Sequence, residues 1–251
     1  MAGSDERQGV RIPVLSGFRP QFWPTVVAIP AVLVLLGLGV WQVERLHWKE
    51  GLIAQRQAAL AATPVAAPRS AETARGLDFH PVIAEGVFRH DKEIFLHATA
   101  ESGRVGYHVY TPLMTDDGRV IFVNRGFIPT DLRDPATRAA GQVAGHVRVQ
   151  GLLRVPPSGR PGWLLPDNDP RQNHWFWVDL PAMAAADGLD NAAPFAIDAD
   201  TTPNPGGWPK GGVTRANLPN DHLQYALTWF SLAVALIVIY VLSQRGDSGR
   251  A

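Results

Sequence analysis

Cysteine is absent from this chain of 251 residues, so the chain can form neither a disulfide nor a zinc site with thiolate ligands. Several catalytic motifs are absent as well: no Walker A loop, Gly-x-Ser-x-Gly elbow or dinucleotide-binding fingerprint occurs. The eight histidines include no His-Glu-x-x-His pair, which excludes that class of zinc site. Because no recognisable catalytic set is present, we expect that the protein is not an enzyme.

Charged residues are missing from two long apolar runs. Trp23–Gln42 contains no charge, and His222–Leu242 contains none that is fixed. About 20 apolar residues are needed to cross the hydrocarbon core of a bilayer, and Pro30 is compatible with a membrane-spanning helix. The first run is also too long for a cleaved signal peptide. We therefore expect transmembrane helices at 22–42 and 221–242.

Two spans place both tails on one side of the membrane and the long central segment on the other. The tails, 1–21 and 243–251, are too short to fold, so the segment 43–220 must carry the function. Lys and Arg flank the two sides in nearly equal number, and long segments cross a membrane largely regardless of charge. The charges alone therefore leave the orientation open.

The central segment is predicted to be mainly β. Asp117-Gly118 between two β-rich runs is a type I′ hairpin signal. Asp179–Gly188 predicts a short helix, with an aspartate cap at its start and a glycine at its end. The expected strands are 79–87, 93–98, 106–114, 119–127, 146–154 and 193–199. Together these patterns predict two transmembrane helices bracketing a mainly antiparallel α+β domain, either open or closed into a barrel.

The entrance to the second span carries the most suggestive side chains. His222 is followed at helical spacing by Tyr225 and Trp229, so all three are expected on roughly one face. A ring nitrogen with aromatic neighbours at the membrane surface suits a large planar amphiphile. Aromatic residues also gather at membrane interfaces because their rings are amphipathic, and the spacing alone favours this plain interfacial interpretation.

Two charged segments of the central domain allow both a structural and a functional interpretation. Asn124-Arg125-Gly126 follows a β run, and its structural interpretation is a turn at the end of a strand. Asp167–Asp179 combines acids, amides and aromatics, which suits a partner or a polar ligand. Its structural interpretation is a turn at Asp169-Pro170 with Trp175 and Trp177 on one face of a strand, and the spacing favours that interpretation.

Short motifs occur in a defined order along the chain: Leu38–Arg45, Gly86–Phe88, Gly106-Tyr107, Thr111–Leu113, Val123–Gly126, Gly151–Arg154, Pro166–Pro170, Asn173–Trp175, Asp179-Leu180 and Asn220–Phe230. As a set, they resemble the surfeit locus protein 1 family of cytochrome c oxidase assembly factors over about residues 37–235.

This resemblance implies a function that the residue patterns alone do not give. It implies a bacterial inner-membrane protein with cytoplasmic tails and a periplasmic domain, which binds haem a and assists its insertion into oxidase subunit I. The implied partners are subunit I, a haem a synthase and membrane lipid, with no role for nucleic acid. His222 matches the family histidine that is tied to haem binding, so the resemblance implies that it is the axial ligand of the iron, flanked by Tyr225 and Trp229.

One departure from the family concerns the residues before this histidine. Mitochondrial members tend to have Arg-Asn-Glu there, whereas this chain has Pro219-Asn220-Asp221. If the family arginine holds a haem propionate, Arg215 or Arg125 must replace it here, since a guanidinium can bind a carboxylate through two hydrogen bonds.

A haem-free role remains as the alternative. In that case the protein is a scaffold for subunit I, and its interface consists of the segment Asp167–Asp179 and the two spans. Gly37 and Gly39 would then allow close approach between transmembrane helices.

Overall fold

A computed structural model describes residues 18–214 and 218–245 of the chain. These residues form two compact units: a helical unit from 18–53 with 218–245, and a sheet unit from 54–214. Each unit is described by itself.

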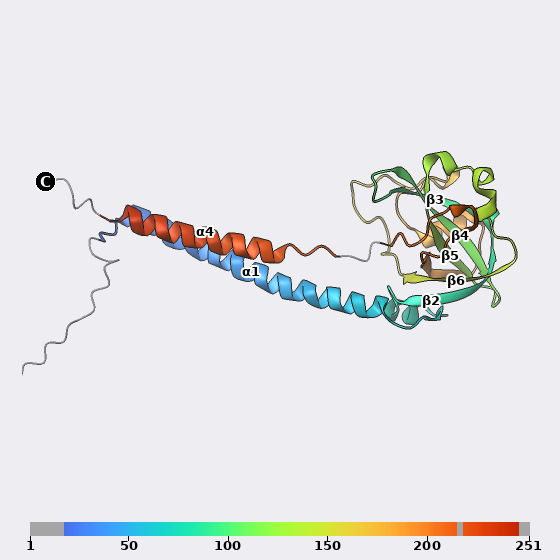
Figure 1. Cartoon of the computed structure of the whole chain (residues 1–251), viewed down its shortest axis with the longest axis horizontal. Helices are drawn as coiled ribbons and strands as arrows, with labels where there is room; N and C mark the ends of the chain where they lie inside the picture. The colour runs from blue at the N-terminus through green and yellow to red at the C-terminus, as the bar shows by residue number, and fades with distance from the viewer. Residues whose placement is uncertain (1–17, 215–217, 246–251) are drawn as a thin grey trace, which may run out of the picture. The chain divides into compact units, whose positions relative to one another are not determined.

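Two long helices, α1 (Phe22–Leu60) and α4 (His222–Ser243), dominate the helical unit. Both are long and apolar enough to cross a membrane by length and composition. The two expected apolar helices are confirmed, and their insertion in a membrane stays a prediction. They lie side by side in opposite directions (Figure 1), with the Thr25 and Tyr240 hydroxyls 2.6 Å apart near one end. α1 continues beyond the apolar run, as a helix of 39 residues containing Pro30.

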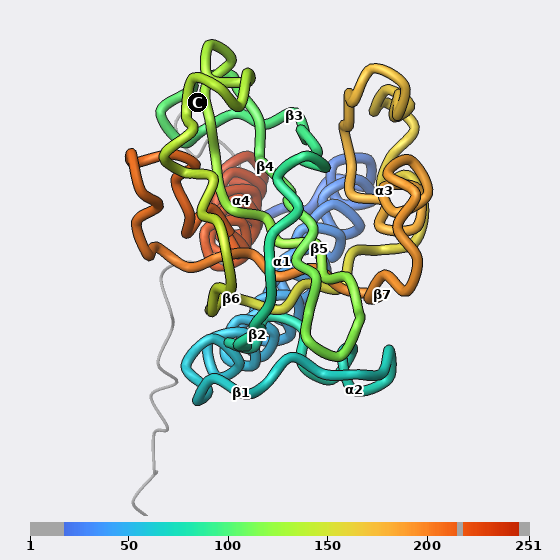
Figure 2. Tube along the Cα trace, turned by 90° about the vertical axis from the view of Figure 1, so that its right-hand side faces the viewer, coloured from blue at the N-terminus to red at the C-terminus, as the bar shows by residue number. Residues whose placement is uncertain are grey.

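The sheet unit contains seven strands among its described residues: β1 (Val65–Ala66), β2 (Pro81–Phe88), β3 (Ile94–Thr99), β4 (Val105–Thr115), β5 (Val120–Pro129), β6 (His146–Arg154) and β7 (Ala192–Ala199). Their order is β1-β2-β6-β7-β5-β4-β3, and β2 also pairs with β4. This extra pairing closes five strands, β2, β6, β7, β5 and β4, into a barrel (Figure 2). The expected α+β domain is confirmed, and it is the closed form.

Most of the strand pairs are antiparallel, as expected, but β5–β7 and β1–β2 are parallel. Two short α-helices, α2 (Ala71–Gly76) and α3 (Leu180–Asp187), accompany the barrel. Asp179 caps α3 by accepting a hydrogen bond from the Ala182 N–H at 3.1 Å, and Gly188 ends it with a positive φ, as the sequence predicts. Short 3-10 helices are η2 (His90–Lys92), η3 (Thr130–Leu132), η4 (Pro135–Gly141), η5 (Pro170–Gln172) and η6 (Pro205–Gly207).

β5 is buried on both of its faces, which explains why its sequence is apolar throughout rather than alternating. Ile121 and Val123 pack in one core cluster with strands of the barrel. Phe122, on the opposite face, packs in a second cluster with Trp175 and the α3 residue Met183. The helix therefore covers the barrel along β5 and β7 (Figure 2).

Three local predictions were wrong. The hairpin between β4 and β5 is present, but Gly118 alone in the loop has a positive φ, so the turn is not of type I′, which requires two such residues. Asn124-Arg125-Gly126 does not end a strand, because β5 continues to Pro129. Trp175 and Trp177 do not share a strand: Trp175 forms an isolated bridge with Leu96, after a left-handed turn at Asn173.

Candidate functional site

The first residue of α4, His222, lies against the residue that ends the apolar run of α1. The His222 Nδ1 atom is 2.7 Å from the Gln42 Oε1 atom, which is hydrogen-bonding distance. Gln42 is only 8% exposed, whereas His222 is half-buried. The two polar side chains thus meet at the entrance of the helix pair, 180 positions apart in the sequence.

The aromatic residues that the sequence groups with His222 have different surroundings. Trp229 is half-buried, while Tyr225 is 54% exposed. Ala226 and Ala233 are the buried residues of α4, and these small side chains allow the helices to approach closely. The face with His222 therefore adjoins the helix–helix contact, with Tyr225 directed outward.

Close approach of the helices also depends on one of the two glycines noted above. A Cβ atom at Gly39 would lie 2.5 Å from the ring of Phe230, so a larger residue there would displace this ring. At Gly37 an added Cβ would meet nothing within 4 Å. Within the described chain, Gly39 therefore has a packing role, while a contact of Gly37 with a helix of another protein stays a prediction.

The entrance offers one imidazole, that of His222, as a potential metal ligand. Within residues 18–214 and 218–245, no group of three or more His, Asp or Glu side chains could hold an ion. A haem iron needs far less from the protein, because one imidazole suffices as axial ligand. The Oδ1 atom of Asn220, two residues before His222 in the sequence, is buried without a partner among the described residues.

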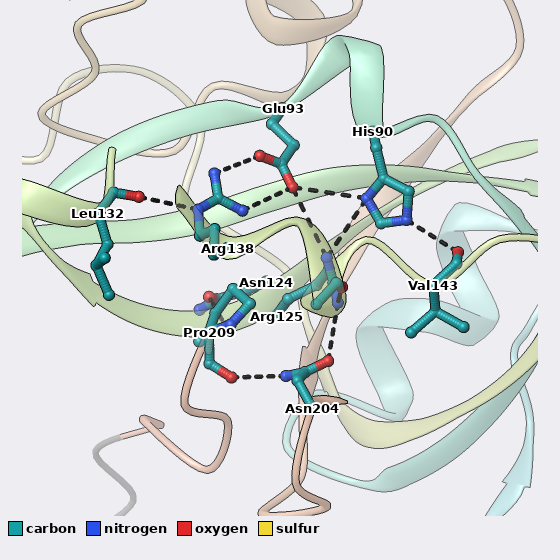
Figure 3. Close-up of polar contacts among 11 residues, drawn as sticks. His90, Glu93, Asn124, Arg125, Leu132, Arg138, Val143, Asn204 and Pro209 are labelled. Atoms are coloured by element: carbon teal, nitrogen blue, oxygen red, sulfur yellow. Dashed lines mark hydrogen bonds and ion pairs between the residues drawn. The ribbon is translucent and has the colours of Figure 1, made fainter. Parts of the chain in front are cut away.

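Arg125, a candidate for a propionate contact, lies in the core of the sheet unit. Its side chain is 2% exposed, and its Nη2 donates to the carbonyl of Gly141 and, at 2.8 Å, to Asn204 Oδ1. Its Nη1 lies 3.7 Å from Glu93 Oε1 (Figure 3). The guanidinium is therefore already occupied within the domain, which argues against a propionate role. The other candidate, Arg215, lies outside the described residues.

Glu93 is the centre of this buried polar network. Arg138 donates to both of its carboxylate oxygens, at 3.1 and 2.5 Å, and the His90 ring lies 3.6 Å away (Figure 3). Burial by itself would raise the pKa of Glu93, but the nearby His90 ring, the hydrogen bonds from Arg138 and the charges of Arg138 and Arg125 outweigh it and lower the pKa. Burial lowers the pKa of Arg125 to about 10. The network thus consists of one buried carboxylate, that of Glu93, between the buried guanidinium groups of Arg125 and Arg138.

The neighbours of Arg125 attach the segment that leads back toward α4. Asn124 Nδ2 donates to Asp198 Oδ1 at 2.9 Å, and Phe127 and Lys210 exchange two backbone hydrogen bonds of 2.9 Å. Gly126 has a φ of +117°, and any Cβ there would collide with the Lys210 carbonyl. Gly126 and Phe127 therefore hold the return segment on the barrel, while Asn124 joins β5 to β7.

The segment Asp167–Asp179 uses its polar side chains internally. The Asn168 Oδ1 atom accepts from the Phe176 N–H at 2.9 Å, and the Asn173 Nδ2 atom donates to the Glu93 backbone carbonyl at 2.7 Å. Trp175 is almost completely buried, and its indole donates to Asn173 Oδ1. These contacts confirm a structural role for this part of the segment.

The comparisons with known proteins agree with the motif pattern. The sequence model of the SURF1 family matches residues 29–234. The chain belongs to the SURF1 family. Surfeit locus protein 1 of Mus musculus is 39% identical over 225 residues, which cover 84% of this chain and 71% of the relative. A SURF1-like protein of Monosiga brevicollis is 36% identical, covering 92% of this chain and 90% of the relative. Surfeit locus protein 1 of Homo sapiens is 39% identical, covering 79% of this chain and 70% of the relative.

The region that matches the SURF1 family includes Gln42, the buried network and His222. Sequence reasoning selected His222 and Arg125 but missed Gln42, Glu93 and Arg138. Gln42 had one available signal, since it is a polar residue at the end of an uncharged apolar run. Glu93 and Arg138 had none, because they are 45 positions apart and meet only through the fold.

Proposed function

We propose that this protein is a membrane-anchored assembly factor for a haem–copper oxidase, which binds haem a through His222 and assists its insertion into subunit I. The observation that supports this most directly is the half-buried His222 at the entrance of an apolar helix pair, hydrogen-bonded to Gln42. Membership of the SURF1 family and the two candidate spans support the same role.

When bound, haem a would supply an iron that takes an imidazole nitrogen as axial ligand. His222 would provide that nitrogen, while Tyr225 and Trp229 would offer aromatic surface beside it. The apolar helices would keep the hydrophobic macrocycle and its tail out of water. One ligating side chain on a half-buried site suits a carrier, because the cargo must also leave.

The family resemblance extends the proposal to location and partners. The two spans would anchor the chain in a bacterial inner membrane, with the barrel in the periplasm and both tails in the cytoplasm. Haem a would arrive from a haem a synthase and leave to subunit I. The membrane lipid around α1 and α4 would be the medium in which this transfer occurs.

The test is the pigment content of the detergent-purified protein after co-expression with a haem a source. We expect a haem a absorption spectrum, which His222→Ala abolishes or strongly weakens. His47→Ala is the matched control, because His47 is an exposed histidine on α1, and that variant should keep the pigment. Equal pigment in His222→Ala and wild-type protein, with both folded, would refute the ligand assignment.

A haem-free scaffold for subunit I is the second candidate, and an exposed loop supports it. Trp163 and Leu164 are 84% and 78% exposed. Arg160 holds this loop by donating to the Gly162 and Trp163 carbonyls at 3.0 and 2.7 Å and to Asp167 at 2.9 Å. An ordered loop that presents two large apolar side chains fits a protein contact. A scaffold would co-purify with subunit I without pigment, and Trp163→Ser would weaken that association.

A further inference from the structure

The hydrogen bond between His222 and Gln42 has a direction that follows from the chemistry of its two atoms. An amide Oε1 atom can only accept a hydrogen bond, so the His222 Nδ1 atom at 2.7 Å must carry the proton. A neutral imidazole carries one N–H, so its Nε2 atom then keeps a free lone pair. The contact thus selects one of the two neutral tautomers.

This selection matters because a metal needs an unprotonated ring nitrogen. Metal-ligating histidines usually donate their other ring N–H to a fixed acceptor, which sets both the tautomer and the ring orientation. Gln42 is well placed for this task, since it is 8% exposed and its Oε1 atom lies 2.7 Å from His222 Nδ1. Water competes poorly for a hydrogen bond at such a buried amide.

We propose that Gln42 is a positioning residue, which holds His222 as the Nδ1–H tautomer and leaves Nε2 as the nitrogen that ligates the haem iron. The choice of Nε2 rests on the proposed haem-binding function, whereas the tautomer is a property of the protein without haem. If the amide had the opposite orientation, its NH₂ group would donate to Nδ1 and the proton would lie on Nε2. The two orientations therefore predict opposite tautomers.

The decisive experiment is an NMR measurement on the haem-free full chain in detergent, with ¹⁵N-labelled histidine. Two-bond ¹H–¹⁵N correlations distinguish the two neutral tautomers, and the signals of His222 are those that disappear in His222→Ala. We expect the Nδ1–H form in the wild-type protein and loss of this preference in Gln42→Leu. Gln42→Glu should retain the Nδ1–H bond, because a carboxylate is also an acceptor.

Gln224→Leu provides the matched control. Gln224 is exposed on the same helix, two residues from His222, so the same chemical change there should leave the tautomer unaltered. The proposal is overturned if wild-type His222 carries its proton on Nε2. It is also overturned if Gln42→Leu retains the wild-type tautomer.

Haem binding supplies a second readout. Loss of such a supporting hydrogen bond typically weakens metal binding by about 10–100-fold, so haem a should dissociate more readily from Gln42→Leu, by a factor in that range. Gln42→Glu should restore retention, and Gln224→Leu should match the wild type. If His222→Ala abolishes the pigment but Gln42→Leu binds haem a as tightly as the wild type, the positioning role fails and the proposed function stands. If His222→Ala keeps the pigment, the proposed function fails, and the tautomer measurement still decides the role of Gln42.

Discussion

Replacing Glu93 by glutamine should destabilise the barrel strongly. The side chains of Glu93, Arg125 and Arg138 are each 2% exposed, so the variant would leave two buried guanidinium groups without their carboxylate. Removal of one partner from a buried ion pair typically costs about 3–5 kcal/mol in the free energy of unfolding. For a domain of this size, each kcal/mol lowers the Tm by about 2–4 °C. We therefore expect Glu93→Gln to lower the Tm by about 6–20 °C.

The measurement is thermal unfolding of the full chain in detergent, followed by near-ultraviolet circular dichroism of the tryptophans. Asp91→Asn is the matched control, because it makes the same chemical change two residues away. Asp91 forms an exposed ion pair with Arg89, and the Arg89 and Asp91 side chains are 44% and 58% exposed. Exposed ion pairs contribute little, so this variant should leave the Tm nearly unchanged. Equal Tm values for the two variants would refute the reasoning.

The same network gives a pH dependence. The pKa of Glu93 is lower in the folded protein than its ordinary value, so the unfolded chain binds more protons as the pH falls between the two pKa values. The contribution of Glu93 to stability is therefore fully present above its unfolded pKa, about 4.3. It is lost as the pH falls through the folded pKa. The Tm difference between the wild type and Glu93→Gln should shrink over this acidic range.

Three further predictions concern single positions. Gly126→Ala should destabilise the barrel severely, because its Cβ would collide with a backbone carbonyl. At Gly118 a Cβ meets open space, so Gly118→Ala should lower the free energy of unfolding by only about 1–2 kcal/mol, because of the positive φ there. Comparable Tm values for the two variants would contradict this. Gly39→Leu should separate the helices and reduce haem a retention, while Gly37→Leu should not, as measured by pigment per protein; equal retention would refute the packing role. The pKa of His97 is lowered by burial and by neighbouring positive charge, so its protonation opposes folding below about pH 6.5. His97→Phe should therefore lose less Tm than the wild type between pH 7.5 and 5, and an equal loss would contradict this assignment.

Local patterns predicted the elements of this protein well. The two uncharged runs lie in α1 and α4, which are long and apolar enough to be candidate membrane spans. β6 has the bounds that its alternation predicts, and the Asp179 cap and Gly188 end of α3 follow from local backbone chemistry. These features depend on residues that are close in sequence.

Features that depend on distant residues were not predictable in the same way. The β2–β4 pairing that closes the barrel and the parallel β5–β7 pair arise only when the whole domain has folded. The Ala/Pro-rich stretch 61–70 predicts a linker, but it contains β1, and α2 begins directly after it. Arg125 was a candidate for a propionate contact, but its side chain is buried among partners from three other parts of the chain.

The candidate site shows the same division. His222 stood out by its place at the start of an apolar helix, which is a local property, and the family resemblance then made it the candidate ligand. Its contact with Gln42 spans 180 positions and becomes visible only when α1 and α4 lie side by side. The sequence therefore pointed to the candidate ligand, and the structure added the residue that orients it.

The absorption spectrum of the purified protein tests the central claim most directly. After co-expression with a haem a source, wild-type protein and His47→Ala should carry haem a, while His222→Ala should carry little or none with its fold intact. A wild-type protein without pigment, or a fully pigmented His222→Ala variant, would contradict the account.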